Sequence, residues 1–163
     1  MMEFRKMRRF RQQLSDEETE KILQEGKTAV LGVIDGNGYP YTVPVNYVYA
    51  DGKIFFHCAR QGEKLDAMRA DDRVSLCVIE KADIVPEELT TYFRSVIVRG
   101  RAKILESPEE IQHAAETLGM KYYPNLEAVQ KEIDRERRIL AVVEVTIDHM
   151  TGKEAIELTK MRK

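Results

Sequence analysis

The sequence has little of what marks several common protein classes. Among its 163 residues there is no tryptophan, and there are only two cysteines and three histidines. Two cysteines cannot build a disulfide framework, so we expect Cys58 and Cys77, each within an apolar stretch, to be reduced thiols that serve as small core residues. Isolated histidines without clustered cysteines or carboxylates do not predict a metal site.

Long apolar runs and an excess of one charge are also missing. The longest apolar stretches, 28–34 and 139–143, are far too short to cross a bilayer, and no charged-then-apolar secretory signal opens the chain. The 26 basic and 28 acidic residues nearly cancel, which gives no reason to expect nucleic acid as a partner. We therefore expect a single cytoplasmic domain over residues 1–163, without a membrane partner.

The segment 1–14 differs from the rest of the chain in its charge. It concentrates five basic residues around a few apolar ones: Arg5, Lys6, Arg8, Arg9 and Arg11. We interpret it as an N-terminal arm that lies on the fold or on a partner subunit. A tail that binds nucleic acid or an anionic surface is the alternative.

Capping and periodicity predict four helices. Ser15 is followed by acidic residues at the capping-box spacing, and Pro108 follows Ser107 at a position typical of a first helical turn. The predicted helices run between Ser15 and Gly26, over 62–70, from Pro108 to about 122–124, and through Leu126, Val129 and Ile133.

Strands are predicted over 28–34, 41–49, 53–59, 73–79, 92–105 and 139–147, with a short closing strand at 155–159. The turns at 35–38 and 51–52 are too short for a crossover helix, so the first three strands should form an antiparallel meander. The long strand alternates between an apolar face (Val96, Val98, Ala102, Ile104) and a polar one (Ser95, Arg99, Arg101, Lys103).

These elements predict a mainly β fold with peripheral helices, closed into a barrel rather than arranged as a doubly wound sheet. Pro44 interrupts the second strand and has no N–H to donate. That strand should therefore be an edge or bulged there, with backbone groups free for another partner such as a ligand.

One segment has features of an anion site. Residues 57–66 pass from a strand end through Gly62 into a helix that carries Lys64, where backbone N–H groups, Lys64 and Arg60 could hold a phosphate. The competing interpretation is a capped helix with solvated basic residues. On its strand, His57 is more typical of a hydrogen-bonded core residue than of a ligand. Serine-hydrolase, Rossmann and P-loop motifs are absent.

Five separated segments resemble one known family in their order and spacing: 38–41, 43–47, 56–59, 62–66 and 91–96. Over about residues 4–160, including a late turn at 151–153, the chain resembles the nitroimidazole-resistance branch of the pyridoxamine 5'-phosphate oxidase-like superfamily. The resemblance implies an FMN-binding split β-barrel that works as a homodimer, with two equivalent FMN sites at the subunit interface.

By the same resemblance, the isoalloxazine ring lies beside the backbone of 43–46, the phosphate lies near His57, Ala59 and Lys64, and the long strand also contacts flavin. The implied cofactor-binding residues are Val43, Pro44, Val45, Asn46, His57, Cys58, Ala59, Lys64, Ser95 and Val96. No side chain is predicted to be catalytic, because the flavin supplies the chemistry.

The sequence departs from the family pattern at two places. Glu63 stands where a basic residue is usual, so we expect either that its carboxylate faces solvent or that flavin affinity is reduced. The arginine and histidine motif that binds pyridoxal phosphate in the oxidase itself is missing at the C-terminus, which argues against vitamin synthesis.

The leading hypothesis is an oxidoreductase that passes electrons from a reduced donor through FMN to a small-molecule acceptor such as a nitroaromatic. One alternative is a non-catalytic flavin- or haem-binding protein for storage or sensing, with His57 as the iron ligand. A structural barrel with an empty pocket is the other alternative.

Overall fold

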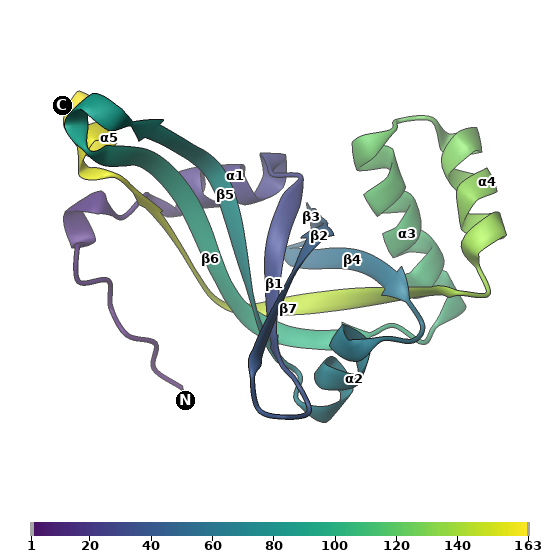
Figure 1. Cartoon of the computed structure of the whole chain (residues 1–163). Coiled ribbons are helices and arrows are strands. Elements are labelled where there is room, and N and C mark those ends of the chain that lie inside the picture. Colours follow the sequence, from purple (N-terminus) through teal and green to yellow (C-terminus); the bar gives the residue numbers. More distant parts are fainter. Residues whose placement is uncertain (1, 163) are drawn as a thin grey trace.

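The computed structural model describes residues 2–162. Its strands are β1 (Thr28–Ile34), β2 (Pro40–Asn46), β3 (Val48–Ala50), β4 (Lys53–Ala59), β5 (Arg73–Val85), β6 (Thr90–Ile104) and β7 (Leu140–Glu154). Its helices are α1 (Asp16–Glu25), α2 (Glu63–Ala70), α3 (Pro108–Tyr122), α4 (Leu126–Glu136) and α5 (Ile156–Met161), with 3-10 turns η1 (Phe10–Gln12) and η2 (Pro86–Glu88). The mainly β class with peripheral helices is confirmed (Figure 1).

The seven strands form one antiparallel sheet in the order β2-β1-β5-β6-β7-β4-β3. β2 and β3 therefore lie at opposite edges of the sheet, although only Tyr47 separates them along the chain. The sheet must curl until its two edges meet, and this closes the barrel. β2 and β3 are joined there by the chain itself, through Tyr47, and not by a ladder of hydrogen bonds. The barrel is therefore split between these two strands.

Side chains from α3 satisfy the backbone at this split. The Tyr47 N–H donates to the Tyr122 hydroxyl at 3.0 Å, and the Tyr47 carbonyl accepts from that hydroxyl at 2.6 Å and from Lys121 Nζ at 3.0 Å. The Tyr47 hydroxyl in turn donates to the Leu23 carbonyl at 2.6 Å. Tyr47 is fully buried, so these bonds replace the ladder that the split interrupts.

Two apolar cores lie on the two faces of the sheet. The larger fills the barrel and includes Leu31, Phe56, Val98 and Val143. The second lies between the sheet and the α3–α4 helical hairpin, where Phe55 and Val142 pack against Leu118 and other helical residues. β7 therefore carries buried residues on both faces, which explains why Ala141, Val142 and Val143 are all buried in succession.

Two sequence predictions about strand pairing are corrected. The second predicted strand, 41–49, is two strands divided at Tyr47: its last residues, in β3, pair with β4 as predicted, whereas β2 pairs with β1, and β4 takes β7 as its other partner. The predicted closing strand at 155–159 is the helix α5, because after the Ala155 N–H donates to Phe93 the N–H groups of Leu158 and Thr159 return to the Ala155 carbonyl. The prediction that Pro44 lies on an edge strand is confirmed, since β2 pairs with β1 alone.

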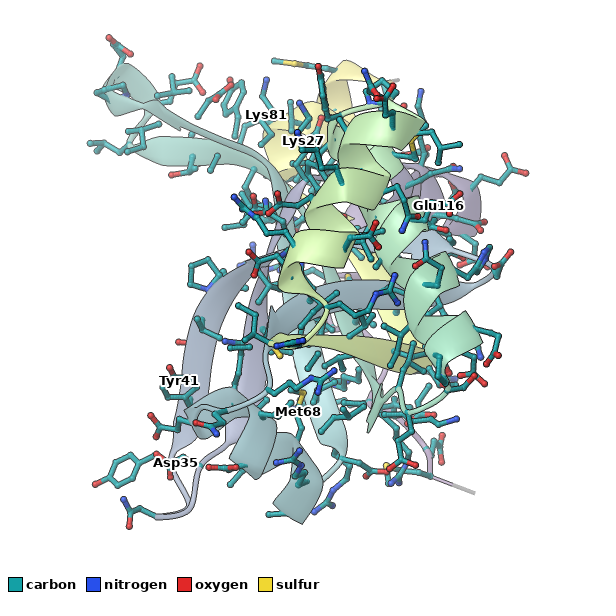
Figure 2. The ribbon with its side chains drawn as sticks, turned by 90° about the vertical axis from the view of Figure 1, so that its right-hand side faces the viewer. Lys27, Asp35, Tyr41, Met68, Lys81 and Glu116 are labelled. Carbon is teal, nitrogen blue, oxygen red and sulfur yellow. The ribbon has the colours of Figure 1, made fainter. Side chains whose placement is uncertain are left out.

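β5 and β6 extend beyond the barrel as a hairpin arm, which we define as residues 79–94. β5 is six residues longer than predicted, ending at Val85 rather than at residue 79, and a bulge between Ile79 and Lys81 marks the point where the arm leaves the barrel. In Figure 2, where Lys81 is labelled, the arm stands away from the rest of the protein. No helix in residues 2–162 is long and apolar enough to span a membrane.

The N-terminal segment lies along the outside of the sheet, in agreement with the interpretation that it packs on the fold. Gln13 bridges to Lys153 of β7, and the Phe4 ring stacks on His149 with centroids 4.6 Å apart. The guanidinium of Arg99 lies 5.6 Å from the centre of the same Phe4 ring. The N-terminal segment therefore contacts β6 and β7 through Phe4, and β7 again through Gln13.

Candidate functional site

A cavity of about 780 Å³ lies between the sheet and the helical hairpin. Its floor is formed by the ends of β2 and β4 and the start of β7, and its roof by α3 and α4, which Figure 2 shows across the front of the sheet. The volume lies within the range of pockets that hold small organic ligands. Its lining residues are Asn46, His57, Cys58, Ala59, Ala115, Leu118, Gly119, Tyr122, Val129, Glu132, Ile133, Glu136, Ile139 and Leu140.

The strand period of β4 places His57 in this cavity. Phe55, His57 and Ala59 share one face of the strand; Phe55 is covered by the helical hairpin, whereas His57 and Ala59 remain exposed. The interpretation of His57 as a hydrogen-bonded core residue is therefore wrong. The hairpin packs over the start of β4 and leaves its end open, so the imidazole faces the cavity.

Asn46 enters from the opposite edge of the sheet. Its side-chain amide donates to the Lys27 carbonyl at 3.2 Å and to the Thr28 hydroxyl at 3.3 Å, and both bonds fix the end of β2 against the start of β1. Tyr122 also lines the cavity, and its hydroxyl accepts a hydrogen bond from the N–H of Tyr47, the residue after Asn46. The split of the barrel thus forms one wall of the cavity.

Burial favours the protonated form of the cavity thiol, Cys58. Cys58 is buried, and this burial raises the pKa of its thiol, although the positive charges of Lys64 and Arg69 offset part of the effect. A thiol with a raised pKa stays protonated at neutral pH. Cys58 is a core residue as predicted, whereas Cys77 is only half-buried on the outer face of the sheet, and both cysteines are free.

The start of α2 lies just beyond the end of β4. Gly62 precedes the helix with a φ of 142°, a conformation that favours glycine, and no side chain caps the first amides. Glu63 is exposed, as expected, while Lys64 is half-buried. Arg60 is committed elsewhere, since its guanidinium donates to the carbonyls of Leu140 at 3.1 Å and Arg137 at 2.9 Å.

The structure brings some of the ten predicted site residues together. Asn46, His57, Cys58 and Ala59 line the cavity. Val43, Pro44 and Val45 lie on the edge strand that leads to Asn46, and Lys64 lies on α2, near enough to Cys58 to influence its thiol. Four of the ten predicted residues thus line the cavity itself.

The remaining two residues lie apart from the cavity. Ser95 pairs with Lys153, whereas His57 pairs with Val142, eleven residues earlier on the same strand (153 minus 142). At ~3.3 Å per residue this is about 36 Å along β7. Ser95 is half-buried on the outer face, and the Val96 side chain is fully buried in the barrel core.

The helical wall of the cavity was not predicted as part of a site. The spacing of Val129 and Ile133 predicted only a helix, yet Glu132 and Glu136 follow at positions that reach the same cavity. The Tyr122-Tyr123-Pro124 stretch was interpreted as a helix end alone. Nothing in one sequence says that an inserted helical hairpin folds back over a particular strand end.

Comparisons with known proteins agree with this architecture. A family model described as pyridoxamine 5'-phosphate oxidase matches residues 15–154. None of the curated proteins matches the sequence.

Several solved structures share the fold. A candidate 5-nitroimidazole antibiotic resistance protein from Bacteroides thetaiotaomicron has a TM-score of 0.71 at 24% identity, covering 87% of this chain and 86% of the other. An FAD-binding protein from Mesorhizobium loti has a TM-score of 0.64 at 24% identity, covering 88% and 96%. A flavocytochrome from Azotobacter vinelandii has a TM-score of 0.74 at 20% identity, covering 92% and 72%. The match of the family model over most of the barrel, together with these folds, shows that the chain belongs to the pyridoxamine 5'-phosphate oxidase-like split-barrel family.

Proposed function

We propose that the protein binds FMN and works as an oxidoreductase, passing electrons from a reduced donor to a small acceptor such as a nitroaromatic. The observation that carries this proposal is the cavity where Asn46, His57 and Ala59 meet beside the uncapped start of α2. Family membership and the flavin-binding proteins of the same fold support a flavin as the ligand.

The start of α2 suits the FMN phosphate. Its first amides have no side-chain cap, and the positive end of the helix favours an anion. Lys64 adds a full charge on the first turn, and the Glu63 side chain is exposed. The flavin ring would then extend toward Asn46 and the open edge of β2, where the backbone of residues 43–46 has no second strand as a partner.

We also propose that two copies of the chain form the complete site. An apolar row crosses the outer face of the sheet, because Pro44 pairs with Val30, Val30 with Cys77, and Cys77 with Ile97. Val30 is 36% exposed and Ile97 is 46% exposed. Apolar rows on an outer sheet face are typical of a covered surface. Ser95 lies two residues from Ile97 on the same face of β6, where it pairs with Ile79.

The apolar row continues onto the hairpin arm. Ile79, Ile84 and Leu89 are 59%, 75% and 95% exposed, and all three lie on β5 or at the arm's tip. A second copy that covers this strip would bring its own Ser95 toward the neighbouring cavity. This arrangement would explain how a residue so far from His57 along the chain's own sheet contributes to a flavin site.

The dimer can be tested by mass in solution. We expect the wild-type chain of 18.9 kDa to elute with twice that mass in light-scattering chromatography, and the double variant Ile79→Asp, Ile97→Asp to be a monomer that loses FMN. Leu126→Asp is the matched control, since Leu126 is also exposed, at 55%, but lies on α4. A monomeric wild type that retains FMN would contradict the dimeric site.

The cofactor is tested first by the visible spectrum of the purified protein and by mass spectrometry of the released chromophore. If FMN is bound, Lys64→Ala should weaken it by about ten- to a hundredfold, the worth of one charge-assisted hydrogen bond. Lys131→Ala, an exposed lysine on α4, should leave affinity unchanged. Turnover of a nitroaromatic with a reduced nicotinamide, faster than with free FMN, separates an enzyme from a storage protein.

Haem binding is the second candidate, and the position of His57 favours it. The imidazole faces the cavity, and among residues 2–162 no hydrogen bond engages it. A flavocytochrome has the same fold. A haem-like absorption band that disappears in His57→Ala would support this candidate, and a protein that stays free of haem when haem is supplied would remove it.

We place the protein in the cytoplasm, without a nucleic-acid partner. Two free cysteines fit a reducing compartment, and a net charge of -2 gives no general attraction for a polyanion. Fractionation of cells that produce the native chain tests the location.

A further inference from the structure

The ionised groups on the cavity wall are of one sign. Glu132 and Glu136 lie one helical turn apart on α4, and both line the cavity. Among the described residues of the lining there is no lysine and no arginine. The only other side chain there that can carry charge near neutral pH is the imidazole of His57.

Two cations that lie next to lining residues, Arg60 and Lys121, are held by other partners. The Arg60 guanidinium donates to two backbone carbonyls on the turn between α4 and β7. Lys121 Nζ donates to the carbonyls of Gly26 and Tyr47, at the split of the barrel. Neither group is free to turn toward a ligand in the cavity without breaking these bonds.

Arg135 only partly neutralises the two glutamates. Its guanidinium lies 2.6 Å from Glu132 and 3.4 Å from Glu136, but its side chain is 70% exposed and does not line the cavity. Two carboxylates share one solvated cation, so the wall keeps a net negative charge. Carboxylates also accept hydrogen bonds and cannot donate them.

The rest of the lining is mostly apolar and shaped by helix packing. It includes Ala115, Leu118, Val129, Ile133, Ile139 and Leu140. Gly119 keeps the two helices close, since a Cβ at this position would come within 2.7 Å of Val129. An apolar lining of this kind and a volume of about 780 Å³ suit an aromatic ring system.

We infer that the part of this cavity next to α4, away from the proposed phosphate position at the start of α2, binds flat aromatic molecules that are uncharged or positively charged, and that Glu132 and Glu136 exclude anions from that part. As a statement about the electron acceptor, the inference rests on the proposed function; as a statement about binding, it does not. Like charges within about 8 Å in a partly solvated site lower affinity by roughly tenfold, less at high salt.

Three molecules of the same shape test this selectivity: 4-nitrobenzamide, 4-nitrobenzylammonium and 4-nitrobenzoate. Calorimetric titration of the purified wild-type protein should show the benzoate binding about tenfold more weakly than the amide, and the ammonium at least as tightly as the amide. In Glu132→Gln, Glu136→Gln the benzoate should approach the amide. Glu127→Gln, also on α4 but outside the cavity, should keep the wild-type order.

Equal affinities of the three molecules for the wild type would overturn the inference, as would binding of none of them or an unchanged order in the double variant. The single variants Glu132→Gln and Glu136→Gln replace the double variant if its circular dichroism differs from that of the wild type. A protein that holds no FMN but keeps the charge discrimination would refute the proposed function and leave this inference standing.

Discussion

Removing one oxygen atom from Tyr122 should weaken the closure of the barrel. In Tyr122→Phe the Tyr47 N–H loses its acceptor, and the carbonyls of Tyr47 and Lys27, which lie 2.6 and 2.5 Å from the hydroxyl, lose the one O–H donor that they share. The phenyl ring itself is retained, so apolar packing changes little. The substitution therefore isolates the hydrogen bonds that span the split.

The magnitude follows from how well water can replace the lost hydroxyl. Tyr47 is fully buried, and an unsatisfied buried group costs about 1–3 kcal/mol, but Tyr122 is 38% exposed and lets some water reach the site. We expect the free energy of unfolding to fall by about 1–2 kcal/mol. For a domain of this size the melting temperature should then fall by about 2–8 °C.

Urea and thermal unfolding, followed by circular dichroism at fixed protein concentration, measure this change. Tyr123→Phe is the matched control, because the neighbouring tyrosine is 62% exposed and its hydroxyl has no hydrogen-bond partner in residues 2–162. If both variants unfold at the same urea concentration, the α3 side chains do not hold the split closed and the reasoning fails.

Two further substitutions test the packing and the charges. Gly100→Ala should lose about 1–3 kcal/mol, because a Cβ there would clash with the backbone carbonyl of Thr146 and come within 2.8 Å of Val145, whereas Gly36→Ala, with open space around it, should be nearly neutral in chemical denaturation. A hydrogen bond from Arg162 lowers the pKa of Glu18 in the folded protein. The interaction therefore stabilises the folded state above the usual glutamate pKa, and this stabilisation is lost as pH falls through the lowered pKa. Glu18→Gln should therefore be less stable than the wild type at pH 7, by up to ~1 kcal/mol, with the gap closing below about pH 4; a gap that persists in acid unfolding curves would refute this origin.

Local patterns predicted most of the elements because each is governed by neighbours in the chain. The capping serines at 15 and 107 do accept from the N–H groups of Glu18 and Glu110, and the alternation in β6 separates buried Val96 and Val98 from exposed Arg99. The pairing of β4 with β7 could not be predicted in this way. It depends on the closure of the sheet, and the chain between these strands is about eighty residues long.

The site was predictable to the extent that it lies on the barrel. Asn46, His57, Cys58 and Ala59 were named from a resemblance in strand segments, and these do line the cavity. The exposure of His57 was not predictable, because its strand neighbours are apolar and the packing of a distant helical hairpin decides which of them is covered. Tertiary contacts thus overrode a local pattern.

Amino-acid substitutions in the helical hairpin need not change the strand pairing of the barrel that it covers. β6 and β7 pair directly on either side of it, from Ile104 opposite Val143 to Arg94 opposite Glu154, so the strands do not need the intervening helices to find their register. The hairpin supplies both glutamates and most of the apolar lining, while the barrel supplies Asn46, His57 and Ala59. Changes in α4 should therefore alter which acceptor binds, and changes near Lys64 should alter whether flavin binds. Lys121 and Tyr122 are the exception, because they belong to the hairpin and yet hold the barrel closed.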